Sequence, residues 1–168
     1  MAKKQRSSTT RGILALRAAH VPFVVHRYPY EARGGTLASS TALSVDEHIV
    51  IKTLVFEDEQ RRPFIVLMHG DCQVSTKALA RALQVKSTSP CTPAVAERHT
   101  GYRVGGTSPF GTRKPLPVYA QASILRLPQL FINAGSRGLL VSLAGADLAS
   151  SLSPTSVDVA LQRSGQQR

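Results

Sequence analysis

The 168-residue sequence contains no tryptophan, only two cysteines and only 10 acidic residues. Cys72 and Cys91 are too few for a disulfide framework, and neither has a partner at the spacing of a zinc site. The sequence also lacks an apolar run of the roughly 18 residues that a membrane span needs. These absences favour a soluble protein in a reducing, cytoplasmic setting, although one bridge between the two cysteines stays open.

The first thirty residues contain no Asp or Glu, and the opening MAKKQRSSTTR superficially resembles a transit or signal peptide. The next segment, GILALRAAHVPF, is interrupted by Arg17 and His20, which argues against the apolar region of a secretory signal. We therefore predict a structural first helix after a flexible basic tail over residues 1–10. A second tail is expected over 163–168, so that a single domain spans residues 11–162.

Basic side chains are in excess, because 21 Lys and Arg face 10 Asp and Glu and give a formal net charge of +11. Most of them are arginines, whose planar guanidinium suits phosphate oxygens. One acid, Glu97, accompanies the basic side chains between residues 76 and 114, which are Lys77, Arg81, Lys86, Arg98, Arg103, Arg113 and Lys114. This excess favours a polyanionic partner; the alternative is a solvated face that only keeps the protein soluble.

Hydrophobic periodicity and capping residues predict short helices mixed with strands. Helices are expected from Thr9 or Thr10 to about Ala19, over 37–44, over 76–84 behind the cap Ser75, from Thr92 to the cap Gly101, and over 146–152, as the last element of the domain. Strands are expected over 23–28, 51–57, 64–69, 116–120, 130–135 and 139–145. This order lacks a regular Rossmann alternation and predicts one mixed α/β domain around a largely antiparallel or mixed sheet.

The segment HTGYRVGGTSPFGTRK, residues 99–114, is rich in small residues. Gly106–Gly111 has the glycine spacing of a Walker loop, but Thr112 and Arg113 stand where Lys and then Ser or Thr are required. Pro109 also removes an amide hydrogen from any phosphate nest. A P-loop nucleotidase is therefore disfavoured. The loop can still offer backbone N–H groups to a ligand; the alternative is a plain turn between a helix and a strand.

Lys52 stands out because it interrupts the apolar segment IVIKTLVF. Such a lysine either extends its ammonium to the strand edge or holds a cation in a pocket, where it can meet an anion or polarise a carbonyl. The motif HGDC over residues 69–72 has neither the second ligand pair of a metal site nor the signs of an activated cysteine. No G-x-S-x-G segment is present, so a serine hydrolase of that type finds no support.

Three segments, IKTLVF, ERHTGYRVGGTSPFG and INAGSRGLLVSL, resemble in order and spacing the YbaK/ProX family of aminoacyl-tRNA editing domains. The resemblance covers about residues 11–162 and implies a mixed α/β domain with a curved, mostly antiparallel sheet. It implies hydrolysis, without a metal or other cofactor, of the ester that joins a wrong amino acid to the terminal adenosine of tRNA. Mischarged tRNA is the implied partner, prolyl-tRNA synthetase is a further candidate partner, and no membrane is involved.

The resemblance also implies roles for individual residues. Lys52 takes the place of the family's invariant lysine, and we expect it to act in catalysis with the backbone of Gly105 and Gly106. The residues implied for substrate binding are Tyr28, Thr53, Ser108, Pro109, Asn133 and Gly135. The residues expected to bind tRNA phosphates are Arg103, Arg113 and Lys114.

Two positions depart from the pattern of the cysteine-specific YbaK members. Asn133 stands where they carry serine, and Leu140 stands where they carry an acid. The pair Lys52–Thr53 still resembles this branch more than the Lys-Asn of the alanine-specific one. The sequence therefore predicts a trans-acting deacylase of mischarged tRNA, with Cys-tRNA(Pro) as its substrate. The alternatives are a deacylase for another small amino acid and a non-catalytic tRNA- or RNA-binding module.

Overall fold

The computed structural model describes residues 9–163. The predicted tails over 1–10 and 163–168 therefore lie mostly outside the described residues. The predicted cap of the first helix is confirmed at Thr10, whose hydroxyl accepts a hydrogen bond from Ile13 N and donates one to Ala134 O. The folded domain thus includes Thr10, one residue before the predicted boundary.

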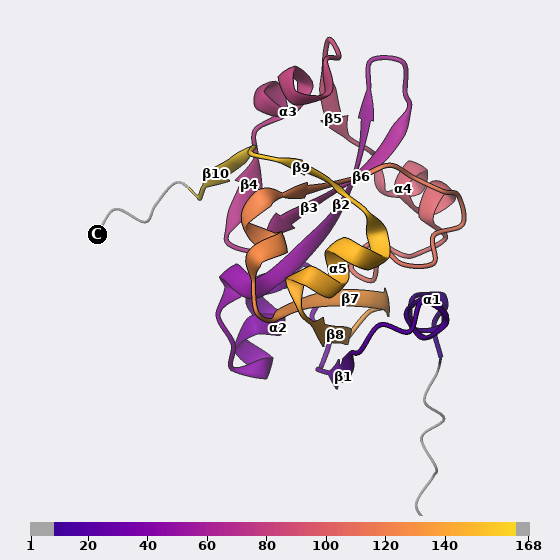
Figure 1. Ribbon diagram of the computed structural model, residues 1–168, viewed down its shortest axis with the longest axis vertical. Helices are drawn as coiled ribbons and strands as arrows, with labels where there is room; N and C mark the ends of the chain where they lie inside the picture. Colours follow the sequence, from indigo (N-terminus) through magenta and orange to yellow (C-terminus); the bar gives the residue numbers. More distant parts are fainter. Residues whose placement is uncertain (1–8, 164–168) are drawn as a thin grey trace, which may run out of the picture.

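Short helices and strands alternate irregularly along the chain (Figure 1). The α-helices are α1 (Arg11–Ala18), α2 (Gly35–Leu43), α3 (Thr76–Leu83), α4 (Pro93–Thr100) and α5 (Gly145–Leu152), with 3-10 turns η1 (Glu47–Ile49) and η2 (Ala122–Arg126). The strands are β1 (Val24–Arg27), β2 (Val50–Asp58), β3 (Pro63–His69), β4 (Cys72–Val74), β5 (Thr88–Pro90), β6 (Val118–Gln121), β7 (Leu130–Ser136), β8 (Leu139–Leu143), β9 (Thr155–Val157) and β10 (Ala160–Gln162).

One mixed sheet organises the domain, in the strand order β1-β8-β7-β2-β3-β6-β9, with β5 attached to β2. Pairing is antiparallel in β1–β8, β7–β8, β2–β3 and β2–β5, and parallel in β2–β7, β3–β6 and β6–β9. The predicted mixed α/β domain is confirmed. The prediction that the helix over 146–152 is the last element of the domain was wrong, because β9 joins the main sheet and β10 pairs with β4.

Helices and loops cover both faces of this sheet (Figure 1). On one face, α1, η2 and α5 pack Leu16, Ile124 and Leu148 onto the core around Ile65. On the other face, α3 packs Leu79 onto a cluster of Phe56, Phe64, Val66, Met68 and Cys72. Neighbouring residues of β3 thus serve opposite faces, as the pleat of a strand requires. No helix within residues 9–163 is long and apolar enough to cross a bilayer.

Within the described chain, the middle of β2 is unpaired on one edge of the strand, which leaves a gap in the sheet. On one edge, β7 pairs with β2 at Val50 and Ile51, and β5 pairs from Phe56 onward. Cys91 N donates to Val55 O at 2.9 Å on that same edge. Backbone groups of successive residues alternate between the two edges of a strand, so the N–H and C=O of Thr53 face the gap as well. The middle of β2 therefore offers main-chain donors and acceptors to a ligand.

Candidate active site

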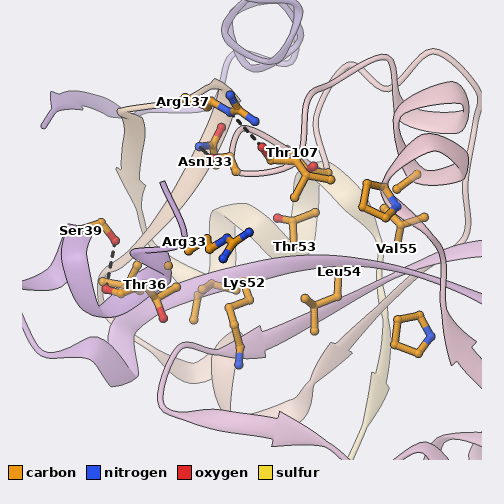
Figure 2. Close-up of a pocket in the computed structure, with 18 of the residues that line it drawn as sticks. Arg33, Thr36, Ser39, Lys52, Thr53, Leu54, Val55, Thr107, Asn133 and Arg137 are labelled. Carbon is orange, nitrogen blue, oxygen red and sulfur yellow. Dashed lines mark hydrogen bonds between the residues drawn. The ribbon is translucent and has the colours of Figure 1, made fainter. Parts of the chain in front are cut away.

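A cavity of about 880 Å³ lies along this gap. Its walls come from the middle of β2, the segment before α2, the start of α4, the glycine-rich loop of residues 101–114 and the turn between β7 and β8 (Figure 2). Most of its lining side chains are apolar, including those of Val50, Leu54 and Leu140. This size and lining are typical of small-molecule sites, in which a few polar groups orient the ligand.

Lys52 and Thr53 both line the cavity but point to opposite faces of β2 (Figure 2). The Lys52 ammonium donates a hydrogen bond to the carbonyl oxygen of Cys72 in β4. Burial, and secondarily the nearby Arg163, lower the pKa of Lys52 below its usual value. The lysine is thus a partly buried cation held by a main-chain acceptor, which offsets part of the cost of its burial.

The Thr53 hydroxyl is buried and has no hydrogen-bond partner among residues 9–163. Figure 2 shows it on the side of β2 that faces Thr107 of the glycine-rich loop. A buried hydroxyl without a partner costs free energy, on the order of 1–3 kcal/mol. A ligand in the cavity that hydrogen-bonds to the Thr53 hydroxyl would recover this cost.

The glycine-rich loop contributes unevenly to the cavity. Gly105 lines it at φ +92, and a Cβ there would lie 2.8 Å from the Tyr30 hydroxyl. Gly106 is buried, and its N–H donates to Arg103 O at 2.8 Å, so this amide is not free to bind an oxyanion. Within the described chain, the amides of Gly105 and Thr107 have no acceptor. These two amides therefore replace the predicted Gly105–Gly106 pair as candidate oxyanion donors.

Three predicted substrate-binding residues do not line the cavity. Ser108 is fully buried, and its hydroxyl accepts a hydrogen bond from Phe110 N at 3.1 Å. Pro109 is buried beside it, and Gly135, at φ +108, packs against the ring of Tyr102. These residues pack beneath the loop and the adjacent turn, outside the cavity lining. Sequence order alone does not distinguish such supporting residues from those that line the cavity.

Tyr28 and Asn133 do line the cavity, and Asn133 has a defined structural task there. Its Nδ2 donates to Gly105 O at 3.2 Å and to Ser136 O at 3.0 Å, while its Oδ1 accepts from Gly135 N at 2.7 Å. These bonds span an irregularity in the β7–β8 pairing. Asn133 thus ties the β7–β8 turn to the glycine-rich loop. Burial raises the pKa of Tyr28 above its usual value.

The basic residues predicted to bind phosphate lie away from the cavity lining. Arg103, Arg113 and Lys114 are exposed, and the Lys114 ammonium lies 3.2 Å from Nδ1 of His99. The arginines that do line the cavity are Arg33, from the segment before α2, and Arg137, from the β7–β8 turn. Sequence reasoning missed both. Arg137 lies within the segment INAGSRGLLVSL, which carries part of the family resemblance, whereas no sequence pattern singled out Arg33.

The HGDC motif forms a compact polar cluster beside the cavity. Nδ1 of His48 lies 2.8 Å from Oδ1 of Asp71, and the same oxygen accepts a hydrogen bond from the Cys72 thiol. The ring of His48 stacks on the ring of His69, with their centroids 3.7 Å apart. Burial is the main cause that raises the pKa of Cys72, and likewise that of Cys91, to about 11. Both cysteines are free and protonated near neutral pH, which makes them poor nucleophiles.

Burial of His69 and His99 should make the protein less stable in mild acid. Burial is the main cause that lowers the pKa of His69 and His99 below the usual 6.5. As pH falls below about 6.5, the unfolded chain therefore binds more protons than the native chain, and the free energy of unfolding falls. We expect the Tm to drop between pH 7.5 and 5, and a His99→Gln variant to show a shallower drop. A Tm that stays constant over this range would contradict the prediction.

Comparison with known proteins identifies the family to which the chain belongs. A profile of the aminoacyl-tRNA editing domain matches residues 35–150, a span that contains β2, the glycine-rich loop and the β7–β8 turn. The chain belongs to this family. The resemblance to YbaK/ProX editing domains drawn from the sequence is thereby confirmed.

Relatives and solved structures of editing-domain type agree with this assignment. EbsC of Enterococcus faecalis, described as a candidate Cys-tRNA(Pro)/Cys-tRNA(Cys) deacylase, is 26% identical over 145 residues, which cover 86% of this chain and 88% of EbsC. The solved structure of a candidate trans-editing enzyme for prolyl-tRNA synthetase has a TM-score of 0.78 at 22% identity, covering 90% of this chain and 95% of the other. The hypothetical protein APE2540 has a TM-score of 0.80 at 17% identity, with 87% and 96% covered. The two structures establish the shared fold.

Proposed function

We propose that this editing domain hydrolyses the ester bond of mischarged tRNA in trans, with Cys-tRNA(Pro) as its substrate, and that it serves prolyl-tRNA synthetase in this way. The observation that carries the proposal is the cavity at the gap of β2, which is lined by Lys52, Thr53, Gly105 and Thr107. The Thr53 hydroxyl and the amides of Gly105 and Thr107 have no hydrogen-bond partner among residues 9–163. The description of EbsC as a candidate Cys-tRNA(Pro)/Cys-tRNA(Cys) deacylase supports the choice of substrate.

The proposed reaction is attack of water on the ester carbonyl carbon. A bond forms between the water oxygen and this carbon, and the bond from the carbon to the ribose oxygen breaks. The products are the free amino acid and a tRNA whose ribose hydroxyl has received a proton. The amides of Gly105 and Thr107 are the proposed donors to the oxygen that becomes negative, and Lys52 adds positive charge to the same cavity. Because an aminoacyl ester is already labile, positioning of the water and the carbonyl group supplies most of the remaining catalysis.

The side-chain preference follows from the lining. Leu140 is 4% exposed and packs with Val50 and Phe131, so the cavity offers an apolar surface at the position where the resemblance places an acid in the cysteine-specific YbaK members. Both polar atoms of Asn133 are occupied by the backbone, which leaves this amide little capacity to select a substrate side chain. We therefore propose small, uncharged amino acids as substrates, and cysteine among them.

Incubation with a panel of mischarged tRNAs tests the function. We expect faster ester loss for Cys-tRNA(Pro) than for Ala-tRNA(Pro), and no loss beyond the spontaneous rate for Pro-tRNA(Pro), which controls for correct charging. Rapid loss of Ala-tRNA(Pro) alone would replace cysteine by another small amino acid. Binding of these tRNAs without acceleration for any of them would overturn the enzymatic proposal and leave a binding module.

A further inference from the structure

The rim of the cavity carries a pair of arginines, Arg33 and Arg137, whose terminal guanidinium nitrogens have no acceptor among residues 9–163. Among the described residues that line the cavity, the cationic ones are Arg33, Lys52 and Arg137, and the only acid is Glu31. No ion pair joins Glu31 to either arginine among residues 9–163. The rim therefore presents uncompensated positive charge next to an otherwise apolar cavity.

Arg137 is held in place by groups that leave its outer nitrogens free. Its Nε donates to Val104 O at 3.0 Å, and its guanidinium carbon lies 5.1 Å from the centroid of the Tyr30 ring. Within residues 9–163 the two terminal nitrogens have no acceptor. A guanidinium fixed in this way loses little conformational entropy when it binds an anion. Arg137 is therefore preorganised for a ligand.

Arg33 approaches the same space from the opposite wall. Figure 2 shows its side chain extending over the cavity from the segment before α2. Its backbone has φ +61, a conformation that side chains other than glycine seldom adopt. Its guanidinium has no hydrogen-bond or ion-pair partner in the described part of the chain. Neither packing nor pairing therefore accounts for an arginine at this position.

We propose that Arg33 and Arg137 form a phosphate subsite that binds the sugar–phosphate backbone of the last nucleotides of tRNA. This inference rests on the proposed function, because an ester within the cavity places the nucleotide to which it is joined at the rim. Forked guanidinium donors match the two free oxygens of a phosphodiester. Phosphate binding was expected of Arg103, Arg113 and Lys114. At the 3′ end of the tRNA, we assign it instead to Arg33 and Arg137, which line the cavity.

The test compares Arg33→Gln and Arg137→Gln with a matched control, Arg61→Gln. Arg61 is exposed and has nearly the same backbone conformation, φ +59, but lies in the turn between β2 and β3 outside the cavity lining. Each variant is assayed with mischarged tRNA and with the aminoacyl ester of adenosine, which has no phosphate. Binding of a fluorescent oligoribonucleotide that ends in CCA is measured separately over a range of salt concentrations.

We expect each rim variant to raise the KM for tRNA about fivefold to tenfold. Arg33→Gln, which breaks no contact within the described chain, should leave kcat/KM for the adenosine ester unchanged. Binding of the oligonucleotide should weaken, and its dependence on log salt should fall by about 0.7 for each arginine removed. Arg61→Gln should match the wild type in every assay. Because Arg33 has no partner in the described chain, Arg33→Gln should also keep the wild-type Tm.

The outcomes separate the subsite from the function. Equal losses on tRNA and on the adenosine ester would overturn the phosphate subsite, as would unchanged KM values for both rim variants. A wild-type protein that does not bind the oligonucleotide would overturn it too. If the wild type binds the oligonucleotide through both arginines but hydrolyses no ester, the subsite stands and the proposed function fails.

Discussion

Replacement of Lys52 by alanine is expected to give a folded protein that deacylates mischarged tRNA about a hundredfold more slowly, or worse. The substitution removes the cation of the cavity together with its hydrogen bond to Cys72 O. The loss of that bond and the relief of a partly buried charge act in opposite directions on stability. The free energy of unfolding should therefore stay within about 1.5 kcal/mol of the wild type. Single-turnover deacylation and urea unfolding measure the two effects separately.

Two companion variants sharpen the test of Lys52. Lys77→Ala removes an exposed lysine from α3, outside the cavity lining, and should retain full activity. Lys52→Arg should not restore the rate, since a planar guanidinium is larger than the ammonium and differs from it in geometry. If Lys52→Ala is folded and deacylates at the parental rate, Lys52 has no part in the reaction. A large loss of stability with unchanged activity would assign it a structural role.

Substitution of Gly105 by alanine should also abolish most activity. The new Cβ would lie 2.8 Å from the Tyr30 hydroxyl, on a backbone at φ +92, and would move the loop that carries the candidate oxyanion amides. We expect a loss of at least about tenfold in kcat, because a shift of one oxyanion donor alone costs that much or more. The conformational strain should cost about 1–2 kcal/mol of stability. Deacylation kinetics and thermal unfolding check both values.

Gly35→Ala is the matched control for this strain. Gly35 also has positive φ, +61, and lines the same cavity, but no atom lies within 4 Å of a Cβ built there. It should share the loss of stability and retain much of the activity. If Gly35→Ala and Gly105→Ala lose activity equally, general strain explains the loss, and the position of the Gly105 amide does not matter.

Local sequence signals predicted most elements of the fold. Thr10, Ser75 and Thr92 cap α1, α3 and α4 through their hydroxyls, and Gly101 ends α4 at φ 78. Such signals are reliable because each depends on a few neighbouring residues. The three-residue strands β4, β5, β9 and β10 were missed. They are too short to show a period, and long-range pairing alone makes them strands.

The sequence by itself determined the class of fold and the family, and it singled out Lys52, Thr53, Gly105 and Asn133, which all line the cavity. Only the tertiary structure decided which groups are free to act. It places Lys52 and Thr53 on opposite faces of β2, and it uses the Gly106 amide and the Ser108 hydroxyl in internal hydrogen bonds. It also brings Arg33 and Arg137, separated by about a hundred residues of chain, to one rim. The physical reason is that side-chain direction and hydrogen-bond partners are set by strand pairing between distant segments, which no local pattern records.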